Sequence, residues 1–584
     1  MTTERTIKLD LTEKSLNDIP VKHSKFDDRP YGLEENRHVY YKYSKEAEEN
    51  VAVSLCNFEA KIIEQITRDN GLDKTNHYKI EARLNNGRGT HVIEIPTNKY
   101  RSMEWIEDLG VSAVINEGHA SQDKLREAIK LNSQDARLRT IFTHTGWREI
   151  DGKMEFLTNS GIIANNKIGI EIDRDLMRYS LLEPVKDCAP AIKESLNFLL
   201  VARLEVTLPL WSAMYLAPLT EINPQISAFT TWIVGESGSY KSTLVALALS
   251  HFGDFDRTNL PANWVSTANR LEELLFYAKD IPIVLDDFKP PPDRFEKREQ
   301  EKKAERIIRS QADRTGRGRM YSNIKYPRGL LIVTGEDLTT GYSRTARIIT
   351  LENNRKEVNT LFMDTAQKNK YQYCQAMSNY IAWLKVNWER LKKKLPARYL
   401  ELRSNSQLES EHPRAPEIIA GLFCGTETAI EFALDNKAID AKEAKTYLHD
   451  AWDIFQELAK KQGLRIEEQR AGRQFLNILK TMYSQGKVKF QPKDSEVQPT
   501  ASTSSEYIGW YYKDKNGDTT YYLDIEAAVI AVKNYSDAFT WGEGAVKKDL
   551  DVMDKLVLKD EGHLTHVIRV GAQTIHAVCL KGFD

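Results

Sequence analysis

Residues 232–253, WIVGESGSYKSTLVALALSHFG, place glycines, a lysine and hydroxyl side chains in an order typical of phosphate binding. The β-branched and aromatic run 230–234 predicts a strand, 235–242 a loop, and the apolar run 243–251 a helix that stops at Gly253. Backbone N–H groups of such a loop bind phosphate oxygens at a helix N-terminus, where the helix dipole favours negative charge. The segment therefore predicts a nucleotide site.

The loop supplies the expected ligands of ATP and Mg²⁺. Lys241 is placed to reach the β- and γ-phosphates, and the Ser242 hydroxyl to ligate Mg²⁺. Gly235, Gly238 and Thr243 complete the set of candidate nucleotide-binding residues.

Tyr240 stands where such loops normally have a glycine before the lysine. A tyrosine is strained at a positive φ. We therefore expect Gly238, instead of Tyr240, to take the tight turn.

A second acidic motif follows about forty residues later. The run DIPIVLDD, residues 280–287, predicts an apolar strand that ends in two carboxylates. Alone, it would be read as a strand followed by a solvated turn. After a phosphate loop, Asp286 is the candidate Mg²⁺ ligand, and Asp287 is the candidate for activating the attacking water. The shorter aspartate at the second place leaves the identity of the base open.

Two further segments offer catalytic groups. The run YPRGLLIVTGEDL predicts another buried strand, and Thr334 at its tip is a candidate for positioning water, or else caps the following turn. In GYSRTARIITLE, Arg344 and Arg347 compete for the role of an arginine that stabilises γ-phosphate charge across a subunit interface.

Composition and length place these motifs in a large intracellular chain. The 584 residues predict three or four domains, with 41% hydrophobic and 28% charged residues and a net charge of -2. Five separated cysteines, no apolar N-terminal signal and no membrane-length run predict a soluble cytoplasmic protein without a membrane partner.

The chain divides into three expected regions. Residues 1–190 read as a mixed α+β domain, with strands at 77–84 and 90–96, a helix at 121–133 and a hairpin that turns at Asp151-Gly152. Residues 191–465 hold the α/β nucleotide-binding core with a helical lid. Residues 466–584 combine helices with two hairpins, the second of them terminal, as in a winged helix.

The order of GESGSYKST, NWVSTANRLEELL, VLDDF, PRGLLIVTGED and the pair Ser343-Arg344 resembles the MCM-like AAA+ replicative helicases of bacterial mobile elements. Within that family the layout is similar to the Cch type of staphylococcal cassette chromosomes and pathogenicity islands. The resemblance implies an AAA+ P-loop ATPase core, ATP between the subunits of a hexameric ring or spiral, and DNA through its pore. It also implies that Arg344 is the arginine finger, the residue that stabilises the γ-phosphate charge across the subunit interface. A primase or polymerase of the same element is a further partner that the resemblance allows.

The segment 314–328 supplies the basic residues expected to hold DNA. Arg314, Arg317 and Arg319 lie around glycines with few acids nearby, which favours sequence-independent phosphate contacts. In MCM-like enzymes a hairpin at this place lines the channel. A nucleotide-sensing loop and a solvated surface remain the alternatives.

Arg414 precedes an apolar helix at the position of a second phosphate sensor in AAA+ proteins. A structural arginine at the start of the helix is the other interpretation.

Two classes of function fit these motifs best. The first is an ATP-dependent DNA helicase or replication initiator of a mobile element, acting on single-stranded or forked DNA. The second is an ATP-regulated protein that binds an origin or operator without unwinding it, which Tyr240 and Asp287 favour because both could slow hydrolysis. A packaging or conjugation translocase fits the Ser-Arg layout less well.

Overall fold

The structure is a computed structural model. It describes residues 30–85, 89–118, 120–162, 169–316, 324–339, 341–406, 414–493, 506–515, 517–536, 539–570 and 573–581. The chain forms two compact units, residues 1–142 and 143–584. The division comes earlier than the boundary near residue 190 that we expected.

The first unit is a mixed α+β domain. Strands β7 (Arg137–Phe142), β4 (Phe58–Asp69), β5 (Lys74–Leu84) and β6 (Thr90–Pro96) lie in that order in one sheet. Helix α1 (Ser121–Leu131) buries Leu125 and Ile129 in the same core as the sheet. A separate antiparallel sheet contains β1 (Tyr31–Glu34), β2 (Arg37–Ser44) and β3 (Glu49–Ser54).

The second unit opens with the expected hairpin. Strands β8 (Gly146–Ile150) and β9 (Lys153–Thr158) pair antiparallel, and the turn residues Asp151 and Gly152 both have positive φ. The short strands β10 (Gly161–Ile162) and β11 (Gly169–Ile170) follow. Trp147 is fully buried, with its ring centroid 4.7 Å from that of Trp388. The hairpin therefore belongs to the core of the second unit, which explains why the first unit ends at residue 142.

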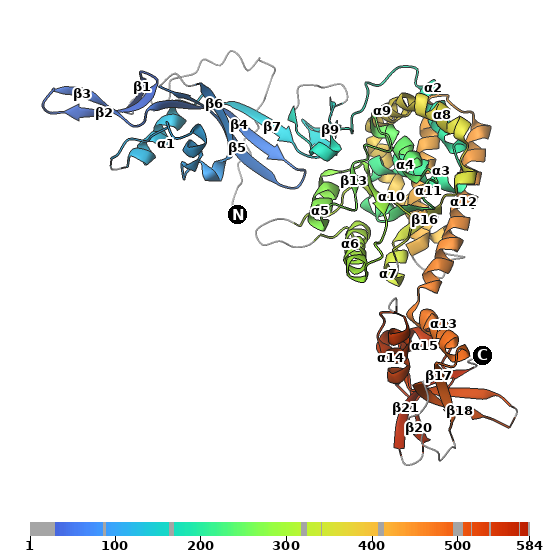
Figure 1. Cartoon of the computed structure of the whole chain (residues 1–584). Helices are drawn as coiled ribbons and strands as arrows, with labels where there is room; N and C mark the ends of the chain where they lie inside the picture. The colour runs from blue at the N-terminus through green and yellow to red at the C-terminus, as the bar shows by residue number, and fades with distance from the viewer. Residues whose placement is uncertain are drawn as a thin grey trace, which may run out of the picture. The chain divides into compact units, whose positions relative to one another are not determined.

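A parallel sheet forms the centre of the second unit (Figure 1). Its strand order is β13 (Ala262–Asn263), β14 (Pro282–Phe288), β15 (Leu330–Gly335), β12 (Thr230–Val234) and β16 (Ile348–Glu352). Neighbouring strands all pair in parallel, and their side chains are almost entirely buried, as in sheets covered by helices on both faces. All strands therefore end at one edge of the sheet, the carboxyl edge, and begin at the other, the amino edge.

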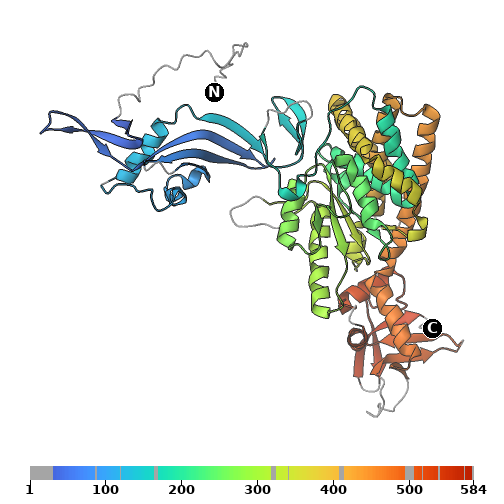
Figure 2. The same cartoon turned by 45° about the horizontal axis from the view of Figure 1, so that its top comes forward.

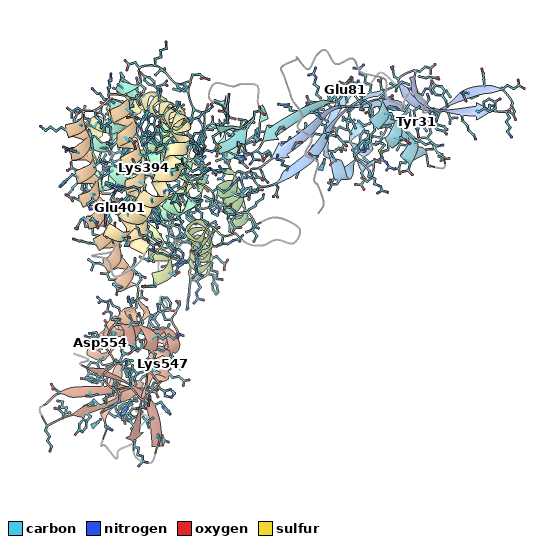
Figure 3. All side chains as sticks on the ribbon, turned by 180° about the vertical axis from the view of Figure 1, so that it is seen from behind. Tyr31, Glu81, Lys394, Glu401, Lys547 and Asp554 are labelled. Carbon is cyan, nitrogen blue, oxygen red and sulfur yellow. The ribbon has the colours of Figure 1, made fainter. Side chains whose placement is uncertain are left out.

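Helices surround this sheet. In chain order they are α2 (Ala189–Asn197), α3 (Leu204–Leu216), α4 (Lys241–Leu249), α5 (Ala268–Tyr277), α6 (Arg294–Asp313), α7 (Tyr342–Thr345), α8 (Thr360–Lys368), α9 (Lys370–Val386), α10 (Trp388–Ser406), α11 (Arg414–Asp435) and α12 (Ala441–Glu468). Helix α11 packs on α3, α10 and α12. Exposed charges on α10, including Lys394 and Glu401, make ion pairs (Figure 3). Helix α12, orange in Figure 2, leads into the last region.

The last region contains the predicted helices and hairpins, and the strands of the hairpins form one sheet. The strand order is β17 (Val488–Pro492), β18 (Glu506–Lys513), β19 (Thr519–Leu523), β21 (Gln573–Lys581) and β20 (His566–Val570). Helices α13 (Ala471–Ser484), α14 (Ile525–Tyr535) and α15 (Glu543–Val552) complete it. The β18–β19 hairpin and the terminal β20–β21 hairpin belong to one five-stranded sheet, and the winged-helix assignment stays a prediction.

Among the residues that the structure describes, no helix is both long and apolar enough to cross a membrane.

Candidate functional site

The glycine-rich loop lies at the carboxyl edge, between β12 and α4. Helix α4 begins at Lys241, two residues earlier than the sequence predicts. A Cβ at Gly235 would collide with the carbonyl oxygen of Asn353, so only glycine fits there. The Asn353 N–H donates to the Val234 carbonyl over 2.8 Å, and its side-chain amide donates to the Ser239 carbonyl. The residue after β16 therefore fixes both ends of the loop.

The expectation for Tyr240 is corrected by its backbone. Gly238 has φ 77°, as expected, but Tyr240 also adopts the left-handed region, with φ 65°. Tyr240, which immediately precedes the first residue of α4, therefore lies in a backbone region that favours glycine. Its half-buried ring lies 6.0 Å from the Arg355 guanidinium, measured to the ring centroid.

Lys241 points into the loop. Its Nζ donates to the carbonyl oxygens of Gly235 at 2.7 Å and Glu236 at 2.8 Å. Burial lowers the pKa of Lys241, while the charges of Glu336, Asp287 and Asp286 oppose that shift. The lysine is thus a cation held inside the loop, with three carboxylates close by.

The two acidic positions and the polar strand tip meet Ser242 directly. The Ser242 hydroxyl donates to Asp286 Oδ1 over 2.8 Å, and the Thr334 hydroxyl donates to the same oxygen. The backbone N–H of Asp287 donates to Thr334 Oγ1 over 3.0 Å. Because β15 lies between β12 and β14, Thr334 at its tip bridges the two acidic residues and the loop.

These oxygens suit Mg²⁺. A hydroxyl and a carboxylate are hard ligands, and Mg²⁺ in proteins commonly takes one or two such groups and completes its shell with water and phosphate. Among the described residues no cluster of three or more His, Cys, Asp or Glu side chains could hold a metal by itself. Ser242 and Asp286 are therefore the residues that would hold Mg²⁺ beside a phosphate.

A cavity of about 710 Å³ opens beside the loop. Tyr240 and Thr243 line one wall, Phe255 lines the cavity from the segment between α4 and β13, and Met363 lines it from α8. Thr243 therefore faces this cavity from the first turn of α4. Both apolar and charged side chains line this cavity beside the glycine-rich loop.

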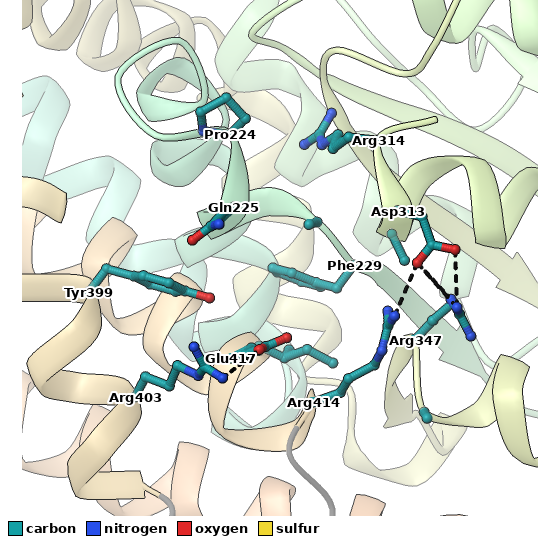
Figure 4. Close-up of a pocket in the computed structure, with 14 residues that line it drawn as sticks. Pro224, Gln225, Phe229, Asp313, Arg314, Arg347, Tyr399, Arg403, Arg414 and Glu417 are labelled. Atoms are coloured by element: carbon teal, nitrogen blue, oxygen red, sulfur yellow. Dashed lines mark hydrogen bonds and ion pairs between the residues drawn. The ribbon is translucent and has the colours of Figure 1, made fainter. Parts of the chain in front are cut away.

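Two of the three arginines predicted to act on phosphate, Arg347 and Arg414, lie at the opposite, amino edge. Arg347 contacts both carboxylate oxygens of Asp313, at 3.0–3.1 Å, and Arg414 contacts one of them at 3.0 Å (Figure 4). They line a cavity of about 390 Å³ together with Arg314 and Arg403, which pairs with Glu417. The Arg347 carbonyl accepts from the N–H of Thr230, the first residue of β12.

This placement separates Arg414 from the loop of its own chain. The loop follows the end of β12, whereas the arginine cavity adjoins residues that precede β12 and β16. Arg414 therefore does not join the nucleotide-binding residues of its own chain. This differs from the expectation that Arg414 senses the phosphate bound by the loop of the same chain.

Arg344 lies apart from both groups. Its Nη1 contacts Glu301 Oε2 at 2.6 Å on α6, and Thr339 Oγ1 donates to the same oxygen over 2.6 Å. The arginine is 17% exposed. The Ser-Arg pair therefore sits beside the middle of α6, and Arg347 beside its end.

The expectation that Arg314 contacts DNA is corrected. Its guanidinium donates to the carbonyls of Pro327 at 2.7 Å and Ser227 at 3.0 Å, and burial lowers the pKa of Arg314 to about 10. A side chain engaged with buried carbonyls is structural. Arg317 and Arg319 lie outside the described residues.

Comparison with known proteins bears on the fold. A family model described as a domain of unknown function, DUF927, matches residues 31–320. No curated protein matches the sequence. A solved structure described as the active helicase Cch of SCCmec type IV is 14% identical, covers 96% of this chain and 98% of its own, and has a TM-score of 0.56. The two chains share a fold. The apo A form of the C-terminal region of NrS-1 is 11% identical, covers 90% and 96%, and has a TM-score of 0.30, from which we infer nothing.

The sequence reasoning missed two residues of the site. Asn353 holds the loop, and Glu336 approaches Lys241 and pairs with Lys289 at 2.9 Å. Glu336 could have been predicted from the sequence, because it stands two residues after Thr334 in TGED. Asn353 had no signal, since nothing local marks an asparagine after β16 as a partner of a loop more than a hundred residues earlier.

Proposed function

We propose that this chain is an ATP-dependent DNA helicase or replication initiator of a mobile genetic element, with an AAA+ P-loop core. The observation that supports it most is the bonded set at the carboxyl edge, in which Ser242 and Thr334 share one oxygen of Asp286 while Lys241 fills the adjoining loop. Nucleotide hydrolysis needs the phosphate-binding lysine, the Mg²⁺ ligands and the residue that positions water around the same phosphate group.

Each residue has a role in this proposal. Lys241 neutralises the β- and γ-phosphates, and Ser242 and Asp286 hold Mg²⁺. When bound, Mg²⁺ offsets the charge that develops on the phosphates. Asp287 is exposed at the edge and accepts the proton of the attacking water, and Thr334 fixes its backbone.

The base of ATP would occupy the 710 Å³ cavity beside the loop. Tyr240 is placed to contact it with the ring that replaces the usual glycine.

The arginine cavity at the amino edge supports assembly. Its arginines Arg347 and Arg414 cannot serve the loop of their own chain, because a whole strand length separates the two edges. In a ring or spiral, the amino edge of one subunit would face the loop of the next. Arg347 then competes with Arg344, the arginine of the Ser-Arg motif, for contact with the γ-phosphate. A hexamer is the assembly implied by the family resemblance.

DNA is the proposed substrate of the motor. The shared fold with a chain described as an active helicase favours this partner, and Arg317 and Arg319 remain the candidate pore residues. A primase or polymerase of the same element is a proposed further partner.

Strand displacement tests the proposal. The purified chain is mixed with a labelled forked duplex, Mg²⁺ and ATP, and with Lys241→Ala as the matched inactive control. We expect ATP-dependent release of the labelled strand by the wild type alone. ATP-dependent retention of a duplex with no displacement would refute the helicase and favour the origin- or operator-binding alternative.

A further inference from the structure

The sheet of the C-terminal region has two different faces. On one face, Ile508, Leu523 and Val578 pack with α13, α14 and α15 in a single core. On the other, a smaller cluster is built around Trp510, Tyr522 and Cys579. Within the described part of the chain, every member of this second cluster comes from a strand, so no described helix contributes a side chain to it. We call this the outer face.

Aromatic rings line the outer face in register. Trp510 pairs with Tyr522, and Tyr522 pairs with Cys579 on the next strand. Tyr512 lies two residues from Trp510, so it shares the same face, and it is 42% exposed. Tyr507 pairs with Lys489 across the β17–β18 ladder and is 38% exposed. Flat rings are therefore presented along β18.

Lysines accompany these rings. The Lys493 Nζ lies 4.9 Å from the ring centroid of Tyr522 and 6.0 Å from that of Tyr512. Lys489 alternates with the buried Phe490, which places it on the outer face.

The charged residues of the five strands are mostly basic. The sequences of β17 to β21 contain one acidic residue, Glu506, against four lysines and arginines. Glu506 stands two residues from Ile508 and so lies on the helix-facing side. The outer face thus combines stacking surfaces with cations and lacks a carboxylate from its strands.

We propose that the outer face binds single-stranded DNA, with bases stacked on Trp510 and Tyr512 and phosphates paired with Lys489 and Lys493. Base–aromatic stacking tolerates any sequence, and lysines along the path of the strand neutralise its backbone. A second copy of this chain is a poorer occupant, because it would set lysines against lysines. The choice of DNA rests on the proposed function.

Binding of labelled single strands to the full-length chain tests this site. The probes are oligodeoxythymidine and a mixed sequence of about 20 nucleotides, longer than a typical single-strand site. We expect Tyr512→Ala with Lys493→Gln to bind both probes roughly tenfold more weakly. The slope of log affinity against log salt should also fall by about 0.7 for the lost lysine.

The matched control removes another lysine–tyrosine pair, which lies beside α14 and not on the outer face. Lys487 lies 4.4 Å from the ring centroid of Tyr535 at the end of α14, so Tyr535→Ala with Lys487→Gln removes an equivalent pair. It should bind as the wild type does. Equal binding by both double variants would overturn the proposal, as would a change of oligomeric state in the outer-face variant without a change in DNA affinity.

Photo-crosslinking with 5-iodouracil in the probe locates the contact. We expect adducts at Tyr507, Trp510 or Tyr512, and adducts confined to residues before 470 would contradict the site. ATP hydrolysis measured on the same preparations separates this inference from the function. If the chain crosslinks at these residues but does not hydrolyse ATP, DNA binding by the outer face is supported and the proposed ATP-driven function is refuted.

Discussion

The two edges of the central sheet differ in how complete they are. At the carboxyl edge, the loop, Lys241, Ser242, Asp286 and Thr334 form one bonded group from three neighbouring strands. At the amino edge, arginines from α10, α11 and the start of β16 surround a cavity, and Asp313 and Glu417 are the acidic residues among the described residues that line it. We propose that the first edge holds a nucleotide and its metal, and that the second edge contributes arginines to a site on another copy of the chain.

We propose that the catalytic groups are divided between two copies of the chain. Asp313 is shared by Arg347 and Arg414, and its pKa is lowered by their hydrogen bonds, although burial opposes this shift. We propose that the γ-phosphate of a nucleotide bound to a neighbouring subunit lies against this edge.

Removing the lysine of the carboxyl edge should have the largest effect. Lys241→Ala eliminates the cation held in the loop, so ATP hydrolysis should fall to the level of buffer in a steady-state phosphate assay. Lys302→Ala, which removes a solvent-exposed lysine of α6 that pairs with Glu299, is the control and should retain hydrolysis. Full activity of the Lys241 variant would remove the carboxyl edge from the mechanism.

Removing an arginine of the amino edge should abolish turnover but preserve binding. We expect Arg347→Ala to bind a fluorescent ATP analogue normally while its turnover falls roughly a thousandfold, because the loop is untouched. Arg390→Ala, which breaks a surface ion pair on α10, should change neither quantity. Loss of nucleotide affinity in the Arg347 variant would show that the two edges are not independent.

The two acids beside Lys241 can be separated by amide substitution. Asp287→Asn should still bind ATP and slow turnover about a hundredfold, as expected for loss of a general base. Glu336→Gln should reduce turnover less than Asp287→Asn does, since Glu336 already pairs with Lys289. If the Glu336 variant is the slower one in single-turnover hydrolysis, the base is Glu336.

Tyr240→Gly gives the smallest expected change. Glycine relieves the left-handed backbone, which costs a tyrosine roughly 1–2 kcal/mol, but it removes one wall of the 710 Å³ cavity. We predict a KM for ATP several times higher, with little change in kcat. Tyr240→Phe, which keeps the ring, should match the wild type, and a KM unchanged by glycine would place the base elsewhere.

The sequence predicted the carboxyl edge better than the amino edge for a physical reason. Asp286 and Thr334 lie near the ends of their strands, and Lys241 and Ser242 open the helix that follows the end of β12, so the parallel strands bring all four together. Arg414 joins Asp313 from about a hundred residues away through packing of α11, which no local pattern encodes. Arg314 looked like a loop cation, but its place one residue after α6 turns it toward the carbonyls of Ser227 and Pro327.

The central claim is that each active site takes its loop from one chain and its arginine from another. Mixing Lys241→Ala with Arg347→Ala, and separately with Arg344→Ala, tests it most directly in a steady-state ATPase assay. We predict that one of these mixtures hydrolyses ATP well above the sum of its two inactive components, because intact half-sites meet at some interfaces. If neither mixture exceeds that sum at concentrations where the wild type is assembled and active, the two edges do not form a shared site.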